Sequence, residues 1–524
     1  MKNLFGQFDM RNGRFTDAST DCASVRAGAI SCAVFGRALA DGINNGEKLI
    51  SIFREKRSSF TEYVSGVYIA VFYDAEEKTL TAFHDRSTSP AVLYYTQNGD
   101  SVYVGTSLKR LLAESGIKRE LNEDAVEDFI TNGYIYGDET LIKGVYKLKA
   151  FHCLSISQNG VKQLPVKYPV EEMSKGQALD AFAPALERAI EDCFTGEDEI
   201  NVPLSSGFDS NYIAYTASKR SGLTINAFSV GGKFGKNELP AVTENAKHYD
   251  RLTLSSALTD ENTLQNLPDI VWRLEGSVYE VGLFLQYELA KLVNQNGKKY
   301  LICGECADQV MNVHYLQNDR IFPEKKDGEP LYYEFSEYPF IFGNYLILKK
   351  NGILANSFGI ETRYPYLDEK LVAISYALRE INGKDKRVHT ANCREKLPPE
   401  VIANMAKIGG ATECHSLFNS KAEIKAFFAK IENSDFYKTH EAVIKRHSFA
   451  EKQKQTGIAK IKTRVRSILM KLLRVKKNDD YFNEEMKLRE YIGIAYLILF
   501  EKLFITGQAD FARNGIDTKL TDLL

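Results

Sequence analysis

The chain has 524 residues, of which 44% are hydrophobic and 26% are charged, and its formal net charge is -2. This length exceeds what one hydrophobic core usually serves, so we expect two domains. The composition excludes disordered, collagen-like and disulfide-scaffold proteins, and the near-neutral charge gives no global attraction to nucleic acid or membrane.

The eight cysteines are scattered along the chain, with one Cys-x-x-Cys pair at Cys303 and Cys306 and no second pair to complete a zinc site. We interpret them as reduced thiols. The amino-terminal residues MKNLFGQFDM contain no apolar run long enough for a signal peptide. The longest apolar stretch, 492–500, is too short for a bilayer, which needs about 20 residues. We therefore expect a cytoplasmic protein without a transmembrane segment.

Residues 1–168 carry short alternating apolar runs separated by turn formers, a pattern typical of antiparallel strands and hairpins. The clearest runs lie at 68–73, 80–83, 92–95 and 102–104. After a proline-containing stretch at 165–169, the sequence pattern changes from alternating apolar runs to helical periodicity. We place the domain boundary near residue 168.

Residues 169–524 alternate helices and strands instead. Helical periodicity over 178–193 leads to an apolar strand at 200–204, a loop of small residues, another helix and a second strand at 225–230. Elements alternating at this spacing predict a parallel sheet with helices on its faces. The chain is therefore expected to be an α/β protein of two domains.

The segment Ser205-Ser-Gly-Phe-Asp-Ser210 joins the first of these strands to a helix. Such a loop presents backbone N–H groups and the positive end of the helix dipole, which suit pyrophosphate, although serine and glycine before a helix also form ordinary caps. Asp209 adds a carboxylate. A second one, Asp308, follows the apolar strand 300–303, whose carboxyl end should lie at the same edge of the sheet. We expect Asp209 and Asp308 to meet across one Mg²⁺ ion.

Four motifs in this half resemble those of the asparagine synthetase family and occur in the family's order. They are Ser205-Ser-Gly-Phe-Asp-Ser210, Gly304-Glu-Cys-Ala-Asp-Gln309, Gly359-Ile-Glu-Thr-Arg-Tyr-Pro-Tyr-Leu-Asp368, and Leu397-Pro-Pro-Glu-Val401 followed by Lys407-Ile-Gly409. Ser206 and Cys306 replace glycines of the family's pattern, and Gln309 replaces a glutamate. The resemblance implies an ATP-pyrophosphatase domain with a helical C-terminal extension, which uses ATP and Mg²⁺.

The resemblance also implies roles for individual side chains. The residues that would bind ATP and its pyrophosphate are Leu204, Ser205, Ser206, Gly207, Asp209, Ser210, Val230 and Gly304. The catalytic residues would be Glu305, Glu361 and Lys407. Glu305 would act as general base for the attacking amine, and Glu361 would orient or share the proton that the amine loses. Lys407 would neutralise charge as pyrophosphate leaves. Glu305 and Glu361 could instead be structural carboxylates, and Lys407 a solvated lysine. Glu238 is a further candidate.

The amino-terminal half resembles the glutaminase domain of the same family over most of its length. The matching segments are Ser65–Asp74, His84-Asp-Arg86, Leu93–Tyr95 and Ser107–Leu112. The resemblance implies an αββα sandwich of the N-terminal-nucleophile type. Glutaminases of this type need a cysteine at position 2, where this chain has Lys2. Processing could in principle unmask Cys22 or Cys32, but buried thiols are the simpler interpretation.

The sequence therefore favours an ATP-dependent ligase that adenylates a small-molecule or peptide carboxylate, releases pyrophosphate and couples the acyl group to an amine. Because glutamine hydrolysis is not expected, the amine could come from the same molecule, as in the related β-lactam synthetases and lasso-peptide macrolactam synthetases. One alternative is an ammonia-dependent asparagine synthetase or another amidating enzyme. Another is a pseudoenzyme that binds nucleotide or a partner without turnover.

Residues 445–477 form a basic segment with twelve Lys or Arg and one acidic residue, Glu451. Apolar residues recur at helical spacing within it, which predicts an amphipathic helix with a basic face. Such a face is commonly just solvated. It could also bind an acidic peptide or carrier, a polyanion or an anionic membrane surface, whereas nucleic acid is not an expected partner.

Overall fold

The computed structural model describes residues 3–40, 42–86, 91–135, 137–168, 171–232, 237–311, 349–405, 413–448, 479–507 and 510–524. Three expectations fall outside these residues. They concern Lys2, Lys407 and nearly all of the basic segment 445–477, of which only 445–448 are described.

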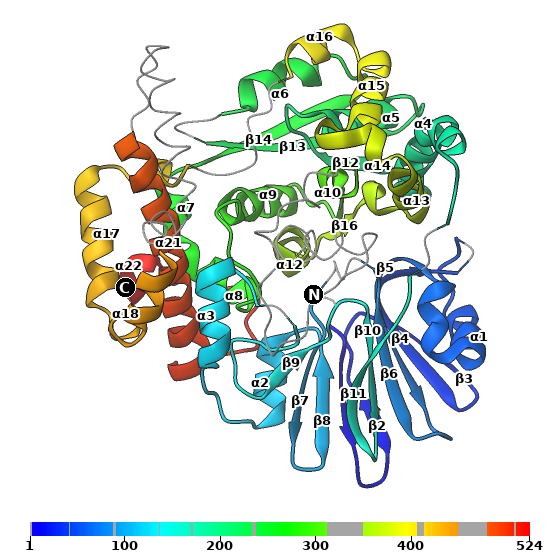
Figure 1. The fold of residues 1–524 in the computed structure, drawn as a ribbon, viewed down its shortest axis with the longest axis vertical. Helices are drawn as coiled ribbons and strands as arrows, with labels where there is room; N and C mark the ends of the chain where they lie inside the picture. Colours follow the sequence, from blue (N-terminus) through cyan, green and yellow to red (C-terminus); the bar gives the residue numbers. More distant parts are fainter. Residues whose placement is uncertain are drawn as a thin grey trace.

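Two antiparallel sheets lie face to face in the amino-terminal half (Figure 1). The first has the order β2-β1-β8-β7-β9, with β1 Phe5–Asp9, β2 Arg14–Asp17, β7 Tyr94–Asn98, β8 Ser101–Gly105 and β9 Val145–Lys147. The second has the order β11-β10-β6-β5-β4-β3, with β3 Ala23–Ala27, β4 Ile30–Leu39, β5 Ser65–Asp74, β6 Thr79–His84, β10 His152–Ser157 and β11 Gly160–Pro165. The expected antiparallel architecture is confirmed.

Helices cover the outer faces of the two sheets. Alternate side chains of each sheet point inward, so Phe8 of β1 and Ile69 of β5 are both fully buried between them. On the other face of the six-stranded sheet, α1 (Gly46–Lys56) packs Phe53 against Phe72, with ring centroids 4.2 Å apart. The five-stranded sheet is covered by α2 (Leu108–Ser115). These four layers are the αββα sandwich that the sequence predicts.

A parallel sheet forms the core of the second half. Its strands β12 (Glu199–Pro203), β13 (Thr224–Gly232) and β14 (Leu252–Thr259) pair in that order, all parallel. Beside β12 lies a second parallel pair, β15 (Tyr300–Ile302) and β16 (Glu361–Arg363). Because all these strands run in one direction, the loops that follow them gather at one edge, where ligands of such sheets bind.

Helices lie on both faces of this parallel sheet, as expected (Figure 1). One face is covered by α4 Lys175–Asp192, α5 Phe208–Ser218 and α6 Leu239–Ala246, and the other by α9 Leu283–Gln295 and α12 Lys349–Ser357. The expected boundary at residue 168 falls between the end of β11 and the start of α4, whose first residue follows the capping side chain of Ser174.

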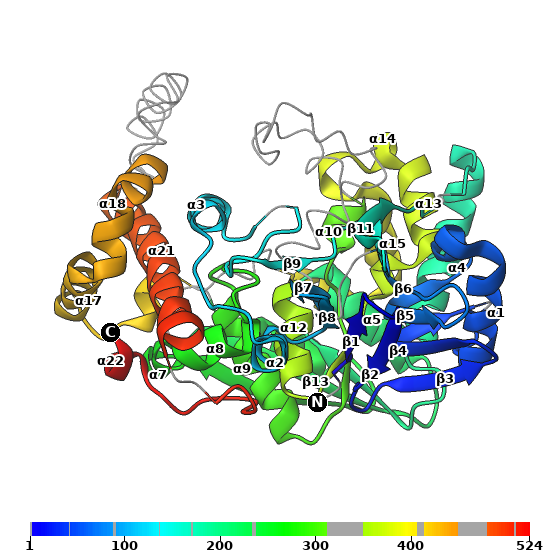
Figure 2. The same ribbon diagram turned by 90° about the horizontal axis from the view of Figure 1, so that it is seen from below.

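The carboxyl-terminal helices pack on α3 of the amino-terminal half and on α8 (Leu267–Leu274) of the second half, rather than on the parallel sheet. Figure 2 shows α18 (Asp435–His447) and α21 (Asp479–Phe500) beside α3 (Glu123–Asn132). Phe129 of α3 stacks on Tyr496 of α21 with ring centroids 5.4 Å apart, and His440 lies 2.7 Å from Glu123. One apolar cluster therefore contains residues from both halves of the chain. In the described part of the chain, no helix is long and apolar enough to cross a membrane.

Candidate active site

The loop between β12 and α5 is held in shape by its own serines. The N–H of Ser205 donates to Oγ of Ser210 at 3.0 Å, the two hydroxyls lie 2.9 Å apart, and the N–H of Gly207 donates to Oγ of Ser205 at 3.1 Å. Gly207 is the N-cap of α5, and the first turn of any α-helix leaves backbone N–H groups without an intrahelical acceptor. Because the N–H groups of Ser205 and Gly207 are bonded within the loop, the donors open to a ligand are those of the first turn of α5, which the loop holds in a preformed arrangement.

The buried side-chain amide of Asn211, in the first turn of α5, also stabilises this loop, and no sequence motif indicated that role. Its Nδ2 donates to the carbonyl oxygens of Ser205 and Gly207 at 2.9 and 2.7 Å. The hydroxyl of Tyr249 in turn donates to its Oδ1 at 3.0 Å. Asn211 is fully buried, so these bonds form away from water, where an unmade bond would be costly.

Ser206, which departs from the resembling motif, has a partner in Glu238. Both the backbone N–H and the hydroxyl of Ser206 lie within hydrogen-bond reach of Oε2 of Glu238, at 2.9 and 3.0 Å. Glu238 precedes α6, so this contact ties the ends of β12 and β13 together across the edge of the sheet. The sequence named Glu238 as a further candidate without indicating this contact.

A second loop, after β15, packs directly against the first. A Cβ added to Gly304 would lie 3.3 Å from the backbone nitrogen of Ser210 and 3.4 Å from the carbonyl carbon of Asp209, so a larger residue would push the loops apart. Two residues later, Cys306 has a φ of 69°, in the left-handed region that favours glycine. This backbone conformation explains why the resembling motif has a glycine at that position.

The carboxylates of Asp209 and Asp308 meet at one cation, the ammonium of Lys386. The Nζ of Lys386 lies 2.7 and 2.8 Å from the two oxygens of Asp209 and 2.9 Å from Oδ1 of Asp308. Burial by itself raises the pKa of Asp209, but Lys386 and His389 outweigh it and hold that pKa well below its usual range. Burial likewise lowers the pKa of Lys386, and the two carboxylates outweigh it and raise that pKa.

Lys386 and His389 were missed in the sequence because no spacing rule links them to Asp209. His389 lies three residues after Lys386, in α15 (Arg387–Lys396), and its Nε2 lies 2.9 Å from Oδ1 of Asp209. The hydroxyl of Tyr366 donates to the backbone oxygen of Asp209 at 3.0 Å. Asp209 is thus held at its carboxylate and at its backbone.

Two carboxylates that share one cation also fit a divalent metal. Mg²⁺ in nucleotide enzymes is typically bound by one or two carboxylates, with phosphate oxygens and water completing its shell. Asp209 and Asp308 supply such a pair of hard oxygen ligands at the end of the loop. Among the described residues, no group of three or more His, Cys, Asp or Glu side chains is placed to hold a metal, so the remaining ligands would come from phosphate or water.

Glu305 lies buried beside this cluster. Burial raises its pKa, and the nearby charge of Asp209 adds to that shift. Its Oε1 accepts a hydrogen bond from Nδ2 of Asn351 at 2.7 Å, and no described residue donates a hydrogen bond to its Oε2. A buried carboxyl group with a raised pKa is a candidate for proton transfer.

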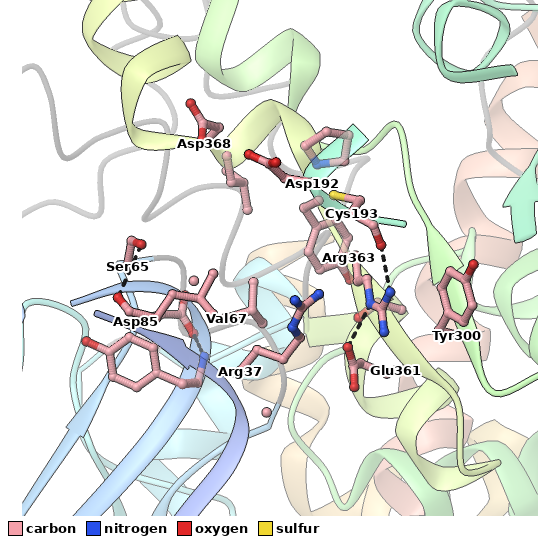
Figure 3. A pocket seen from close by; sticks show the side chains of 18 of the residues that line it. Arg37, Ser65, Val67, Asp85, Asp192, Cys193, Tyr300, Glu361, Arg363 and Asp368 are labelled. Atoms are coloured by element: carbon pink, nitrogen blue, oxygen red, sulfur yellow. Dashed lines mark hydrogen bonds and ion pairs between the residues drawn. The ribbon is translucent and has the colours of Figure 1, made fainter. Parts of the chain in front are cut away.

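Glu361 lies away from that cluster, in a cavity between the two halves of the chain. Its Oε1 accepts a hydrogen bond from Nε of Arg363 at 2.8 Å (Figure 3). Glu361 pairs with Tyr300 at the start of β15, whereas Glu305 follows the end of that strand, so the strand itself, about 10 Å long, separates their backbones. The two carboxylates that the sequence grouped together thus face different surroundings.

The cavity has a volume of about 840 Å³ and takes its walls from both halves. The side chains labelled in Figure 3 are Arg37, Ser65, Val67 and Asp85 from the amino-terminal half and Asp192, Cys193, Tyr300, Glu361, Arg363 and Asp368 from the other. Arg37, at the end of β4, reaches toward Glu361 and Arg363 (Figure 3). Within the described part of the chain it forms no ion pair, although it is only half exposed.

Two other predicted site residues, Leu204 and Val230, lie at the parallel sheet itself rather than in the two loops. Leu204 is buried, and its N–H donates to the carbonyl oxygen of Phe228 in β13 at 2.8 Å. Val230 is half-buried in β13, where it pairs with Ala257 of β14. Leu204 directly follows β12 and Val230 lies in the last part of β13, so both are near the edge that carries the two loops.

Comparison with known families agrees with this arrangement. Residues 41–168 match a family model described as a glutamine amidotransferase domain, and residues 181–325 match one described as asparagine synthase. The chain carries an asparagine synthase domain behind a glutamine amidotransferase domain. The asparagine synthase match includes both loops, with Asp209 and Asp308, and ends before Lys386.

Curated relatives of this chain are distant in sequence. It is 20% identical over 380 residues to asparagine synthetase B (glutamine-hydrolysing) of Escherichia coli, covering 68% of this chain and 62% of the relative. It is 23% identical over 283 residues to asparagine synthetase 1 (glutamine-hydrolysing) of Bacillus subtilis, covering 52% and 43%. The chain therefore spans less than two thirds of the length of either relative.

Two solved structures are also similar, both at low scores. An allosteric regulatory enzyme of purine biosynthesis matches with 9% identity and a TM-score of 0.20, covering 45% of this chain and 62% of that one. A glutamine phosphoribosylpyrophosphate amidotransferase from B. subtilis, complexed with ADP and GMP, matches with 8% identity and a TM-score of 0.21, covering 71% and 86%. Similarity at this level carries no argument about the fold, which is defined here by the sheets and helices themselves.

Two of the three cysteines among the described residues of the amino-terminal domain are buried and have raised pKa values. Cys32 is buried in the six-stranded sheet, and burial raises its pKa to about 12. Cys153 is buried too, and burial raises its pKa to about 11. Cys22 is half-buried and lies just before β3. Thiols with pKa values this high stay protonated at neutral pH and are poor nucleophiles.

Proposed function

We propose that this protein is an ATP-dependent ligase that adenylates a substrate carboxylate and couples it to an amine without hydrolysing glutamine. The observation that carries the proposal is the meeting of Asp209 and Asp308 at Lys386. This cluster lies beside a loop with backbone donors suited to pyrophosphate. An anion-binding loop, two metal-binding carboxylates and a lysine together form what adenylation requires.

The first step would join the substrate to AMP. A carboxylate oxygen of the substrate attacks the α-phosphorus of ATP, the bond to the bridging oxygen breaks, and pyrophosphate leaves. Ser205, Gly207 and Ser210 would hold the pyrophosphate, while Asp209 and Asp308 would hold Mg²⁺, which screens the phosphate charge when bound. Lys386 is placed to move from the carboxylates to the departing pyrophosphate. Lys407 remains a prediction for the same electrostatic task.

The second step would form the amide. The amine nitrogen attacks the acyl carbon, the bond to the AMP oxygen breaks, and the nitrogen gives up a proton. Glu305 supports this step because its carboxyl is buried, its pKa is raised, and one of its oxygens has no donor among the described residues. Glu361 would act from the cavity, where its hydrogen bond from Arg363 orients it. Both roles are proposals.

The absence of glutamine hydrolysis is supported by residue identity in the amidotransferase domain. Lys2 stands where the resembling glutaminases have their nucleophilic cysteine, and Cys32 and Cys153 are buried with raised pKa values. The amine must then reach the acyl-adenylate from solution or from the same molecule. We favour an intramolecular amine, which would make the product a lactam or macrolactam.

The cavity between the halves supports a substrate larger than ammonia. Its volume of about 840 Å³ is in the range of sites for drug-sized ligands. Arg37 projects into it without an ion pair among the described residues, and a half-buried guanidinium is stabilised by a bound carboxylate. A carboxylate-bearing small molecule or peptide fits these surroundings. We therefore assign a substrate-binding role to this cavity.

The experiment that tests the function is magnesium-dependent exchange of labelled pyrophosphate into ATP, with candidate carboxylates and peptides as substrates and Asp209→Asn as the control variant. Exchange that disappears in the variant supports adenylation. If wild-type protein binds Mg·ATP but supports no exchange with any carboxylate, the ligase proposal gives way to a nucleotide-binding pseudoenzyme. Supplying ammonia or organic amines to an exchange-competent protein then identifies the amine class.

A further inference from the structure

His389 lies at the centre of a packed aromatic shell beneath Asp209. The residue is fully buried, and its ring lies 5.5 Å from that of Tyr366, 5.8 Å from that of Tyr212 and 6.1 Å from that of Phe182. The sulfur of Cys393, one turn further along α15, lies 3.6 to 3.7 Å from the two ring nitrogens. Contacts on several sides fix the direction in which the imidazole points.

That direction is toward the carboxylate of Asp209. The Nε2 of His389 lies 2.9 Å from Oδ1 of Asp209, a normal hydrogen-bond distance. An ionised carboxylate can only accept hydrogen bonds, so Nε2 carries the hydrogen and donates it. The hydroxyl of Tyr366 donates to the backbone oxygen of Asp209 instead, which leaves His389 as the neighbour that orients the carboxylate from within the core.

Lys386 contacts the same carboxylate but holds it differently. Its ammonium is a point charge on a flexible stem, and it contacts both oxygens of Asp209 and one oxygen of Asp308. A divalent cation that binds these aspartates competes with Lys386 for those oxygens. If the ammonium were displaced, packing would still hold the imidazole in place with its donor on Oδ1, and Oδ2 would be left for the cation.

We propose that His389 is a positioning residue that holds the Asp209 carboxylate in the orientation required by a Mg²⁺-bound nucleotide. The inference rests on the ATP-dependent function proposed above and adds to it. It resembles the general behaviour of metal sites, in which a hydrogen-bonded neighbour of a ligand tunes affinity by about 10- to 100-fold. Neither the predicted motifs nor the matched region 181–325 includes this residue.

The test compares His389→Gln with His389→Asn. Glutamine carries an amide donor at about the reach of Nε2, whereas asparagine is one methylene shorter and leaves its donor too far from Oδ1. Cys393→Ala serves as the control, because it removes a contact with the same ring without touching Asp209. Mg·ATP binding is measured by calorimetry over a range of Mg²⁺ concentrations, together with thermal unfolding of each protein without ligand.

We expect His389→Asn to raise the Mg²⁺ concentration for half-maximal nucleotide binding about 10-fold or more, and His389→Gln and Cys393→Ala to remain within about threefold of wild type. Equal Mg²⁺ dependence of the Asn and Gln variants, at equal stability, would overturn the positioning role. Wild-type protein that binds no Mg·ATP would instead overturn the proposed function itself, so the two failures are distinguishable.

Discussion

The ammonium of Lys386 lies 2.7 Å from one oxygen of Asp209 and 2.8 Å from the other. The two residues are 177 positions apart in the chain, and Asp308 joins them at 2.9 Å. Lys386 is buried, and the pair stands between the two loops that we propose to bind ATP. The balance of charge among Lys386, Asp209 and Asp308 therefore affects both the stability of the free protein and the binding of a cation.

Replacing Lys386 by methionine should destabilise the free protein by about 3 kcal/mol, because two carboxylates would be left with a poorly compensated negative charge. Added Mg²⁺ should restore part of this loss and stabilise the variant more than it stabilises wild type. Thermal and urea unfolding with and without Mg²⁺ measure both effects. Lys175→Met, which breaks an exposed pair with Glu380, is the control and should change stability by less than about 1 kcal/mol. A Lys386→Met variant as stable as this control would contradict the prediction.

The lowered pKa of Asp209 makes stability depend on pH in the acid range. The carboxyl of an unfolded chain titrates near pKa 3.9, so below about pH 4 the unfolded state binds a proton that the folded state excludes. The stabilising contribution of Asp209 is therefore complete above about pH 5 and is lost as the pH falls toward the lower, folded pKa. Unfolding free energies between pH 6 and pH 3 should fall more steeply for wild type than for Asp209→Asn. Parallel curves for the two proteins would show that Asp209 makes no such contribution.

Replacing Arg37 by leucine should weaken substrate binding in the cavity and leave nucleotide binding unchanged. A charge-assisted hydrogen bond contributes about 1.5 to 3 kcal/mol, so the KM for the carboxylate substrate should rise about 10-fold or more. Arg26→Leu changes an exposed arginine on the neighbouring strand β3 and is the matched control. Equal KM values for the two variants would remove Arg37 from the proposed substrate site. Calorimetry with Mg·ATP checks that the nucleotide site is intact.

Replacing Glu305 by glutamine should separate the two proposed steps. Burial already favours the neutral form of this carboxyl, so the neutral amide should fit with little loss of stability. Pyrophosphate exchange should persist, while amide formation should fall about 10²- to 10⁴-fold, the usual contribution of a general base. Single-turnover measurements of acyl-adenylate and product distinguish the steps. Loss of exchange and of amide formation to the same extent would place Glu305 in nucleotide binding instead.

Much of the architecture could be predicted because strand patterns and turn residues are local signals. Alternating runs predicted antiparallel strands, whose arrangement in an αββα sandwich was implied by the resemblance to the glutaminase domain. Alternation of strands and helices predicted the parallel sheet with Asp209 and Asp308 at one edge. That edge forms because the carboxyl ends of parallel strands share one side of the sheet, so the encounter of these two residues follows from topology.

The partners of these aspartates could not be predicted in the same way. Lys386 and His389 lie on a helix far along the chain, and helical periodicity does not reveal which strand edge a helix end will approach. Glu361 shows the opposite problem. Its motif matched the expected one, yet its position at the start of β16 places it in the cavity between the halves, and its catalytic role stays a prediction.

The stacking of Phe129 on Tyr496 gives the amino-terminal half a role that does not depend on its own chemistry. Deleting residues 1–168 would remove α3, against which α18 and α21 pack, and expose apolar side chains of these two helices to water. The amino-terminal half therefore contributes to the folding of the whole chain. A chain shortened to the remaining half would first need a new polar surface on its last helices.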